Sequence, residues 1–398
     1  MSASSAELPA GGGVARVRAG VVELREVTKR YGRSERAAVD GLSLEVPAGE
    51  VCVLIGPSGC GKTTALKMIN RLIEPTSGEI LIDGRSVRER DPARLRREVG
   101  YVIQQVGLLP HLTVGANVGT VPRLLGWDRS RTTARTRELL RLVGLDPDEY
   151  GERYPAQLSG GQQQRVGLAR ALAGDPPVML MDEPFSAVDP ITRHRLQNDF
   201  LRLHRAVPKT VVFVSHDIDE AVKMGDRVAV MREGRLVQYA PPAELLAAPA
   251  DDFVADFVGA DRALKSLSLT RLEDIELLEA PVVAVGEPVE AVRARVASGA
   301  LAPLGGAVLV TDGDGRPRDW LPVDRLGGAG VVPDRPPGGA EPVIDRVTTL
   351  RDALSAILGA SSGYGAVVDG GGRCVGLVGA AEIVSGFRRV AAPEGARG

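Results

Sequence analysis

The stretch Val51-Cys-Val-Leu-Ile-Gly-Pro-Ser-Gly-Cys-Gly-Lys-Thr-Thr64 decides the fold. Its first five residues form a continuous apolar run that predicts a buried strand, and its end opens a helix. Between them, Gly56 to Thr63 fits the pattern G-x-x-x-x-G-K-[ST]. Glycines let backbone N–H groups turn inward around an anion, and the following helix adds its positive N-terminal end. The stretch therefore predicts a phosphate-binding loop; an ordinary glycine-rich turn is the alternative.

Such a loop by itself indicates only a nucleotide phosphate. Lys62 would reach the β- and γ-phosphates, and the Thr63 hydroxyl would bind Mg²⁺. The side chain of Cys60 is interpreted as incidental packing within the loop. The predicted nucleotide-binding residues of the loop are Gly56, Pro57, Ser58, Gly59, Cys60, Gly61, Lys62, Thr63 and Thr64.

Two further apolar runs end in polar side chains. Val178-Met-Leu-Met181 leads into Asp182 and Glu183, and Thr210-Val-Val-Phe-Val214 leads into Ser215-His216. Ligands of parallel sheets lie beyond the carboxyl ends of the strands. We expect Asp182 to hold Mg²⁺ and Glu183 to act as general base toward the attacking water. The alternative is a pair of acids that cap a helix, since Pro184 follows.

Composition limits the number of domains and the classes of function that the chain can have. The 398 residues are 44% hydrophobic and 25% charged, enough for two domains with sizeable cores. A net charge of −2 argues against a nucleic-acid binder that neutralises phosphates along a basic face. The sequence has no run of about 20 apolar residues that would predict a membrane helix, and residues 1–19 predict a disordered tail, not a signal peptide. Three widely spaced cysteines favour a reducing compartment.

The C-terminal third contains a weak internal repeat of about 57 residues. The turn sequence Val310–Arg316 aligns with Val367–Arg373, and a helix is predicted upstream of each, over 288–298 and 349–358. The segment 327–342, dense in Gly and Pro, predicts a flexible connection. Two small α+β units in tandem are therefore expected after the α/β domain.

The run Leu158-Ser-Gly-Gly-Gln-Gln-Gln-Arg165 stands between the phosphate loop and the acidic strand end. With it, the region from about Val21 to Val258 resembles the ATPase subunits of ABC transporters in the order of its motifs. The resemblance implies a P-loop NTPase fold with ATP and Mg²⁺ as cofactors. It implies that Tyr31 stacks on the adenine, although a tyrosine at a strand end often simply packs. It also implies that Gln104 touches Mg²⁺ and the membrane partner.

The same resemblance assigns the remaining site residues. Ser186 to Asp189 is similar to the loop that crosses the dimer interface, and His216 to the switch histidine at the γ-phosphate. His111, His194 and His204 have no such context and are interpreted as surface or packing residues. The expected catalytic set is Lys62, Gln104, Glu183 and His216, and the expected Mg²⁺ set is Thr63, Gln104 and Asp182.

Residues at the start of the next helix complete the expected site. Ser159, Gly160, Gly161 and Gln162 open it, and such an N-terminus binds anions. In the family, this signature faces the γ-phosphate held by the other subunit. The resemblance thus implies a head-to-tail dimer of two copies with two ATP molecules between them.

The subgroup follows from two segments. Ile103–Thr113 and Asp261–Leu269 resemble the importers of glycine betaine, carnitine, choline and proline, in which a tandem CBS pair follows the ATPase. The implied partners are separate membrane permease subunits and an extracytoplasmic substrate-binding protein, with this chain on the cytoplasmic face of the membrane. The expected domains are ABC ATPase at 20–260, a first CBS-like unit at 261–330 and a second at 331–398.

The CBS-like units depart from the pattern that binds adenosyl ligands. That pattern has a Thr or Ser followed three residues later by Asp, whereas the second unit has Gly379 and Glu382. In the first unit Asp324 is present but Leu321 takes the hydroxyl position. The region has slightly more acidic than basic residues, so a basic patch for ionic-strength sensing at anionic lipid is not evident. A dimerising or spacing domain is the plainer alternative.

Rival functions remain open at this point. An ABC importer for another small solute has the same motifs, as does a soluble ABC ATPase that acts on DNA or ribosomes. The latter usually carries two ATPase domains or coiled-coil insertions. A GTPase or kinase would leave Leu158 to Arg165 unexplained. A regulatory sensor built on the CBS pair would predict a degraded ATPase site.

Overall fold

The structure is a computed structural model that describes residues 19–32, 36–103, 107–186, 188–326, 330–334, 339–360 and 362–391. The chain forms two compact units, unit 1 up to Gly259 and unit 2 from Ala260 onward. Among the described residues, none of the helices has the length and apolar character needed to cross a membrane.

The central sheet of unit 1 has six strands in the order β10-β9-β3-β8-β7-β6. The strands are β3 (Val51–Ile55), β6 (Val99–Val102), β7 (Val178–Asp182), β8 (Thr210–Val214), β9 (Arg227–Arg232) and β10 (Arg235–Ala240). The pairs are parallel except for the β9–β10 hairpin. Every residue of β3, β7 and β8 is buried, which explains their unbroken apolar runs. Because β3, β7 and β8 run parallel, the phosphate loop after β3 and the polar residues after β7 and β8 lie at one edge of the sheet.

A second, antiparallel sheet completes the sheet core of unit 1 in the order β2-β1-β4-β5. It consists of β1 (Val22–Lys29), β2 (Val39–Val46), β4 (Ser77–Ile82) and β5 (Arg85–Ser86). In β2, buried side chains such as Leu42, Leu44 and Val46 alternate with exposed ones. These pack in one cluster with Leu54 of β3 and Leu66 of the first helix. That helix is thus fixed between the two sheets.

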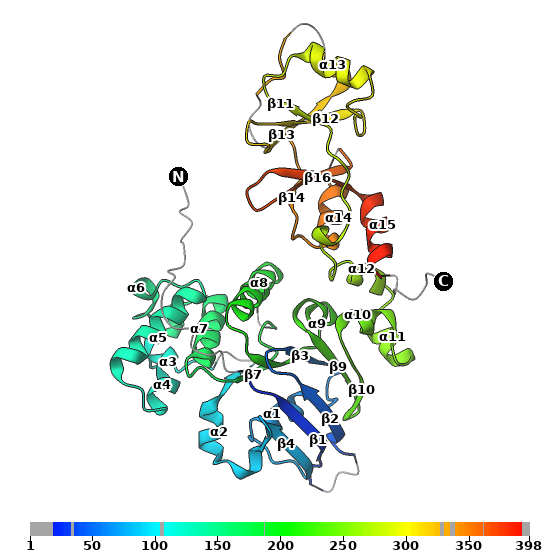
Figure 1. The fold of residues 1–398 in the computed structure, drawn as a ribbon. Coiled ribbons are helices and arrows are strands. Elements are labelled where there is room, and N and C mark those ends of the chain that lie inside the picture. The colour runs from blue at the N-terminus through cyan, green and yellow to red at the C-terminus, as the bar shows by residue number, and fades with distance from the viewer. Residues whose placement is uncertain are drawn as a thin grey trace. The chain divides into compact units, whose positions relative to one another are not determined.

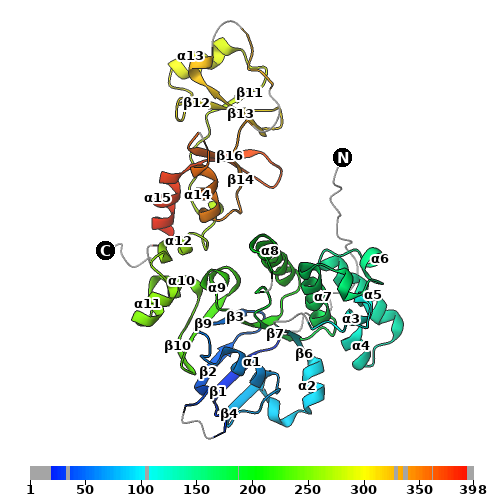
Figure 2. The same ribbon diagram turned by 180° about the vertical axis from the view of Figure 1, so that it is seen from behind.

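Eleven α-helices of unit 1 are described, and one group of them lies beside the sheets. They are α1 (Lys62–Ile69), α2 (Pro92–Glu98), α3 (Val114–Val118), α4 (Thr120–Leu124), α5 (Arg129–Leu142), α6 (Pro147–Tyr150), α7 (Gly160–Leu172), α8 (Pro190–Ala206), α9 (Ile218–Met224), α10 (Pro242–Ala247) and α11 (Asp252–Val258). Figures 1 and 2 show α3 to α7 gathered together beside the sheets. Helices α1, α8 and α9 directly follow β3, β7 and β8, so each helix start lies near a strand end.

Unit 2 opens with α12 (Arg262–Ser266) and contains two modules of the same topology. The first has β11 (Val282–Ala284), α13 (Val289–Ala297), β12 (Ala307–Thr311) and β13 (Pro317–Pro322). The second has β14 (Val343–Asp345), α14 (Leu350–Leu358), β15 (Tyr364–Val368), β16 (Cys374–Gly379) and α15 (Ala380–Ala391). Each sheet has one parallel and one antiparallel pair. The structure thus has the two tandem α+β units of the internal repeat, and their assignment as CBS domains stays a prediction.

The cores of the two modules cut across the boundaries expected at 261 and 331. Leu267 and Leu272 precede the first module in the chain, yet they pack in the core of the second, beside Ile344 and Leu350. Val332 follows the expected boundary but packs in the core of the first module. Core packing therefore divides unit 2 differently from the repeat in the sequence.

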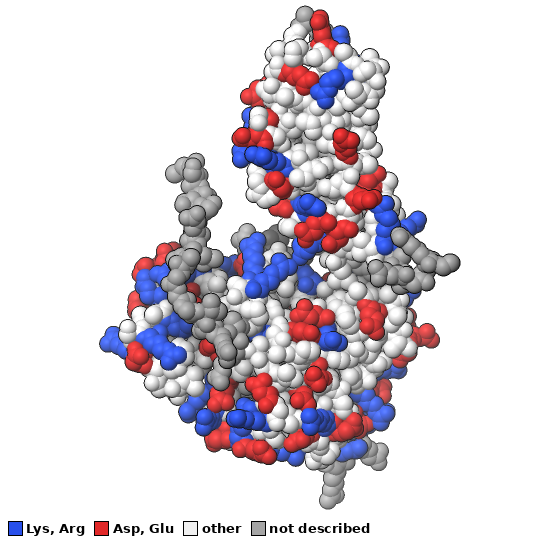
Figure 3. Space-filling view, in the orientation of Figure 1, with Lys and Arg blue, Asp and Glu red and all other residues white. Residues whose placement is uncertain are grey.

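The two modules also share an apolar seam. Leu309 of β12 packs with Ala340, Ala366 and Leu377 of the second module. The backbone N–H of Cys374 donates to the carbonyl oxygen of Gly315 at 2.9 Å, which joins the two repeated turns. On the face seen in Figure 3, acidic and basic side chains are mixed on both units, so no field of one sign covers that face.

Candidate functional site

The predicted phosphate loop connects β3 to α1, and its glycines take conformations that other residues rarely adopt. The φ angle is 144° at Gly56, 80° at Gly59 and 104° at Gly61. A Cβ on Gly56 would lie 2.1 Å from the carbonyl oxygen of Met231, and one on Gly61 would lie 2.3 Å from that of Ala38. Only glycine fits at these two positions. The loop is therefore held closely against β9 and against the residue that precedes β2.

We expect Gly56→Ala to destabilise unit 1 by roughly 2 to 4 kcal/mol, because the added Cβ would force β9 away from the loop. Urea unfolding followed by circular dichroism measures this change. Gly160→Ala is the control, since a Cβ there meets no described atom within 4 Å. Equal midpoints for Gly56→Ala and the parental chain would contradict the tight contact.

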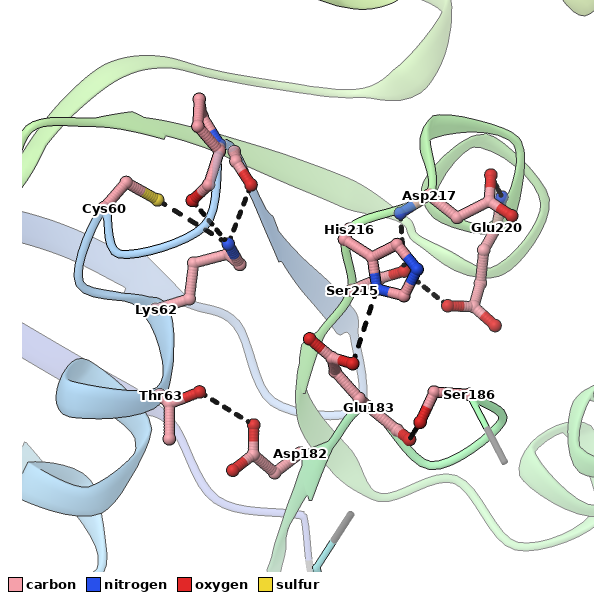
Figure 4. Close-up of polar contacts among 12 residues, drawn as sticks. Cys60, Lys62, Thr63, Asp182, Glu183, Ser186, Ser215, His216, Asp217 and Glu220 are labelled. Atoms are coloured by element: carbon pink, nitrogen blue, oxygen red, sulfur yellow. Dashed lines mark hydrogen bonds and ion pairs between the residues drawn. The ribbon is translucent and has the colours of Figure 1, made fainter. Parts of the chain in front are cut away.

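Lys62 is buried, and its ammonium group lies over the loop (Figure 4). Its Nζ donates to the carbonyl oxygens of Gly56 at 2.7 Å and Pro57 at 3.0 Å. A third contact, at 3.7 Å, goes to the Sγ of Cys60, which is a weak acceptor. Cys60 is thus buried against the lysine, and a phosphate oxygen could take its place as the third acceptor.

Thr63 and Asp182 bring a hydroxyl and a carboxylate together at the end of β7. The Thr63 hydroxyl donates to Oδ1 of Asp182 at 3.0 Å. Burial raises the pKa of Asp182, and the Thr63 hydroxyl and the nearby Lys67 only partly offset this effect. A buried carboxylate that is costly to ionise alone is suited to a cation partner. This oxygen pair fits Mg²⁺, which usually takes one or two protein oxygens and completes its shell with phosphates and water.

Glu183 and His216 meet although they end different strands. The N–H of Glu183 donates to the carbonyl oxygen of Val214 at 3.0 Å, and φ at Glu183 is 46°. Its Oε2 lies 3.4 Å from Nδ1 of His216, and the His216 side chain is 60% exposed. Figure 4 shows the two side chains facing one another across the strand ends. A non-glycine residue held at positive φ is a strained conformation often found at functional sites.

One pocket collects these groups. It is lined by Ala38, Ser58, Gly59, Gly61, Lys62, Thr63, Thr64, Glu183 and His216. A second pocket shares Ala38 and Gly59 with it and contains Tyr31, which is 49% exposed. The ammonium group of Lys29 lies 5.2 Å from the centre of the Tyr31 ring. The exposed ring thus borders a hollow next to the phosphate loop, which is where a base attached to bound phosphates would lie.

The signature residues lie elsewhere in unit 1. Ser159 caps α7: its Oγ accepts from the N–H of Gln162 at 3.3 Å, and Oε1 of Gln162 accepts from the N–H of Ser159 at 2.9 Å. This capping box fixes the helix start, where Ser159 and Gly160 are exposed. Ser159 to Gln162 are not among the described residues that line the pocket of Lys62. Their role opposite another subunit's phosphates stays a prediction.

Asp189 and Gln104 were predicted at the dimer interface and at the metal, respectively. Asp189 is exposed and caps α8, where its Oδ1 accepts from the N–H of Thr192 at 3.0 Å. Gln104, expected at the metal and at the membrane partner, lies outside the described residues. The described members of the predicted catalytic set, Lys62, Glu183 and His216, line the same pocket.

The sequence did not indicate Ala38 or the β9–β10 turn as site residues. Arg232 to Leu236 line the pocket next to the phosphate loop, together with Arg36 and Asp40. The sequence signal that could have indicated this turn is Glu233-Gly234, a pair typical of a tight turn between two strands. Of the other histidines, His111 is exposed, and His204 stacks on Phe200 at 6.0 Å between ring centres. His194 contacts Nζ of Lys223 at 3.4 Å.

The chain is similar to proteins of known family. Residues 39–186 match a family model described as ABC transporter. The osmoprotectant import ATP-binding protein OsmV of Salmonella typhimurium is 56% identical over 258 residues, which are 64% of this chain and 68% of that protein. The glycine betaine uptake system ATP-binding protein YehX of Escherichia coli is 48% identical over 64% of this chain and 82% of that protein. The glycine betaine/carnitine/choline transport ATP-binding protein OpuCA of Bacillus subtilis is 52% identical over 62% of this chain but less than two thirds of that protein, 64%.

Solved structures also match this chain over part of its length. The ATP-binding cassette MJ0796, a dimer in a post-hydrolysis state bound to ADP and Pi, is 36% identical with a TM-score of 0.50. The match covers 55% of this chain and 98% of that one. The structure of cbiO1 from Clostridium perfringens has a TM-score of 0.55 at 24% identity, covers 62% of this chain and 94% of that chain, and supports the fold alone.

Proposed function

The chain belongs to the ATP-binding proteins of ABC transporters, and on that premise we propose that it hydrolyses ATP to energise import of an osmoprotectant quaternary amine. The observation that carries the proposal is one pocket lined by Lys62, Thr63, Glu183 and His216, with Asp182 bonded to Thr63. Relatives at 48–56% identity are named for glycine betaine, carnitine, choline or osmoprotectants, which supports these solutes, with proline as a fourth candidate.

Each of the site residues has a distinct role in the proposed reaction. Lys62 places a positive charge over the loop, where it would bind the β- and γ-phosphate oxygens. Thr63 and Asp182 would hold Mg²⁺, which supplies positive charge that stabilises the transferred phosphoryl group. Glu183 would accept the proton of the attacking water, and His216, 3.4 Å away, would orient that carboxylate and contact the γ-phosphate.

The proposed assembly is a head-to-tail pair of this chain. The exposed start of α7, with Ser159 and Gly160, would complete the pocket of a second copy. ATP binding and hydrolysis would bring the two copies together and let them separate, and the region of Gln104 would pass this movement to membrane permease subunits. An extracytoplasmic binding protein would deliver the solute. The chain would then act at the cytoplasmic face of the membrane. The dimeric relative bound to ADP and Pi supports the pairing.

Solute uptake by cells tests the function. In the strain that carries this chain, we expect deletion of its gene to abolish high-osmolarity uptake of at least one of radiolabelled glycine betaine, choline, carnitine and proline. A plasmid copy of the parental chain should restore it. Unchanged uptake of glycine betaine, choline and carnitine would overturn the quaternary-amine assignment, because proline is a secondary amine. A different labelled solute whose uptake is lost would then identify another kind of importer.

A further inference from the structure

The turn between β8 and α9 holds His216 in place through the residue before it. Ser215 is buried, and its hydroxyl donates to the carboxylate of Glu220 while accepting from the N–H of Asp217 at 3.0 Å (Figure 4). Asp217 in turn caps α9 by accepting from the N–H of Asp219 at 2.9 Å. The exposed ring of His216 lies between these two fixed residues. The Ser215 contacts thus hold the backbone on both sides of His216, whose ring lies 3.4 Å from Glu183.

Glu220 is a buried carboxylate that the proposed reaction does not use. It is 7% exposed and is not among the described residues that line the pocket of Lys62. Its second oxygen accepts from Nε2 of Gln197 at 3.0 Å, and Oε1 of Gln197 accepts from Nζ of Lys223 at 3.1 Å. Burial raises the pKa of Glu220, and the hydrogen bonds from Ser215 and Gln197 partly offset this effect. Such a satisfied buried network fixes the side chains that it joins.

Helix α8 links this network to the predicted dimer loop. Gln197 and Arg193 are four residues apart, so they lie on the same face of α8. The guanidinium of Arg193 donates to the carbonyl oxygen of Val188 at 3.3 Å, next to Asp189. At the other end of the loop, the Ser186 hydroxyl donates to the carbonyl oxygen of Glu183 at 2.9 Å. One helix thus contacts both the loop and the carboxylate that holds Ser215.

We propose that Glu220 is a positioning residue for hydrolysis. Through Ser215 it orients the His216 ring toward Glu183, and through Gln197 it couples this orientation to the position of α8 and the dimer loop. The inference rests on the proposed function and adds a residue to it. A shift of α8 that follows contact of the dimer loop with another subunit would reach His216 by this route. Hydrolysis would then depend on the position of α8 as well as on the pocket.

Steady-state ATP hydrolysis by the full-length chain tests this role. Glu220→Ala should lower kcat by about 10- to 100-fold, because His216 would lose its orientation. The KM for ATP should stay within about threefold, since Lys62 and Thr63 are unchanged. Glu220→Gln keeps an acceptor for the Ser215 hydroxyl but replaces the oxygen that accepts from Gln197 by an NH2 donor, so it should recover part of the lost kcat. Asp219→Asn, on the exposed side of the same helical turn, is the matched control and should leave kcat unchanged.

A double variant separates positioning from a merely structural effect. In a His216→Ala background, Glu220→Ala should cause no further loss of kcat, because the two residues act in series. If Glu220→Ala does not fold, as judged by its melting temperature, Gln197→Met takes its place and should lower kcat in the same His216-dependent way. Additive losses, or an unchanged kcat in Glu220→Ala, would overturn the positioning role while leaving the proposed function intact. A parental chain without Glu183-dependent hydrolysis would instead overturn the proposed function, and the positioning role with it.

Discussion

Replacing Glu183 with Gln is expected to lower the rate of ATP hydrolysis by about a thousandfold while ATP binding is retained. The amide has the size of the carboxylate, but it does not accept a proton from the attacking water. The contacts that would hold the nucleotide, from Lys62 to the loop and from Thr63 to Asp182, are unchanged. Phosphate release measured at saturating ATP gives the rate, and calorimetry gives the affinity.

The same variant should also accumulate as a dimer in ATP and Mg²⁺, because in the proposed head-to-tail pair hydrolysis of the ATP between the two copies would let them separate. Analytical ultracentrifugation with and without ATP measures this. Glu244→Gln is the matched control, since Glu244 is an exposed carboxylate in the first turn of α10. Parental hydrolysis by Glu183→Gln would show that another group is the base, with His216 the next candidate.

Lys62→Ala is expected to weaken ATP binding by roughly a hundredfold, the usual effect of losing hydrogen bonds to a charged group. The ammonium group is already held over the loop by the Gly56 and Pro57 carbonyls, so it meets the phosphates with little reorganisation. Calorimetric titration with ATP and Mg²⁺, carried out in the Glu183→Gln background, isolates binding from turnover.

Lys67→Ala provides the comparison for this variant. Lys67 lies on the same helix more than one turn later and is exposed, and its alanine variant should bind ATP within a few fold of the parental chain. A hundredfold loss in both variants would indicate a general effect of charge near α1. A loss in neither would contradict the assignment of Lys62 to the phosphates.

Much of the site could be predicted because its chemistry is local in the sequence. The loop from Gly56 to Thr63 needs its glycines and lysine at fixed spacings, and the strand before it needs an apolar run. The ends of β7 and β8 follow the same rule, since polar residues after buried strands lie at the ligand-binding edge. For this reason Asp182 and Glu183 could be placed at the predicted site from their positions after β7, whereas the role of His216 came from the resemblance to the family.

The rest depends on tertiary packing. Ser215 gave no signal beyond its place before His216, because its partner Glu220 and the Gln197 behind it come from separate helices. The antiparallel sheet was not predicted, since β1 and β4 are joined only by long-range pairing. In unit 2, the repeat indicated two modules but not that Leu267 and Leu272 pack in the second. Hydrophobic side chains do not specify which apolar surface they cover.

That last arrangement has a consequence for how unit 2 unfolds. The first residues of unit 2 pack in the core of the second module, the next residues form the first module, and the last residues complete the second. Leu309 and Leu377 pack together at the seam between the modules. The second module is therefore not a contiguous segment that could be cut out with its core intact, whereas the core of the first lies within residues 283–332. Unit 2 should melt in a single cooperative transition, and a shortened protein is best ended at Gly259, where the contacts divide.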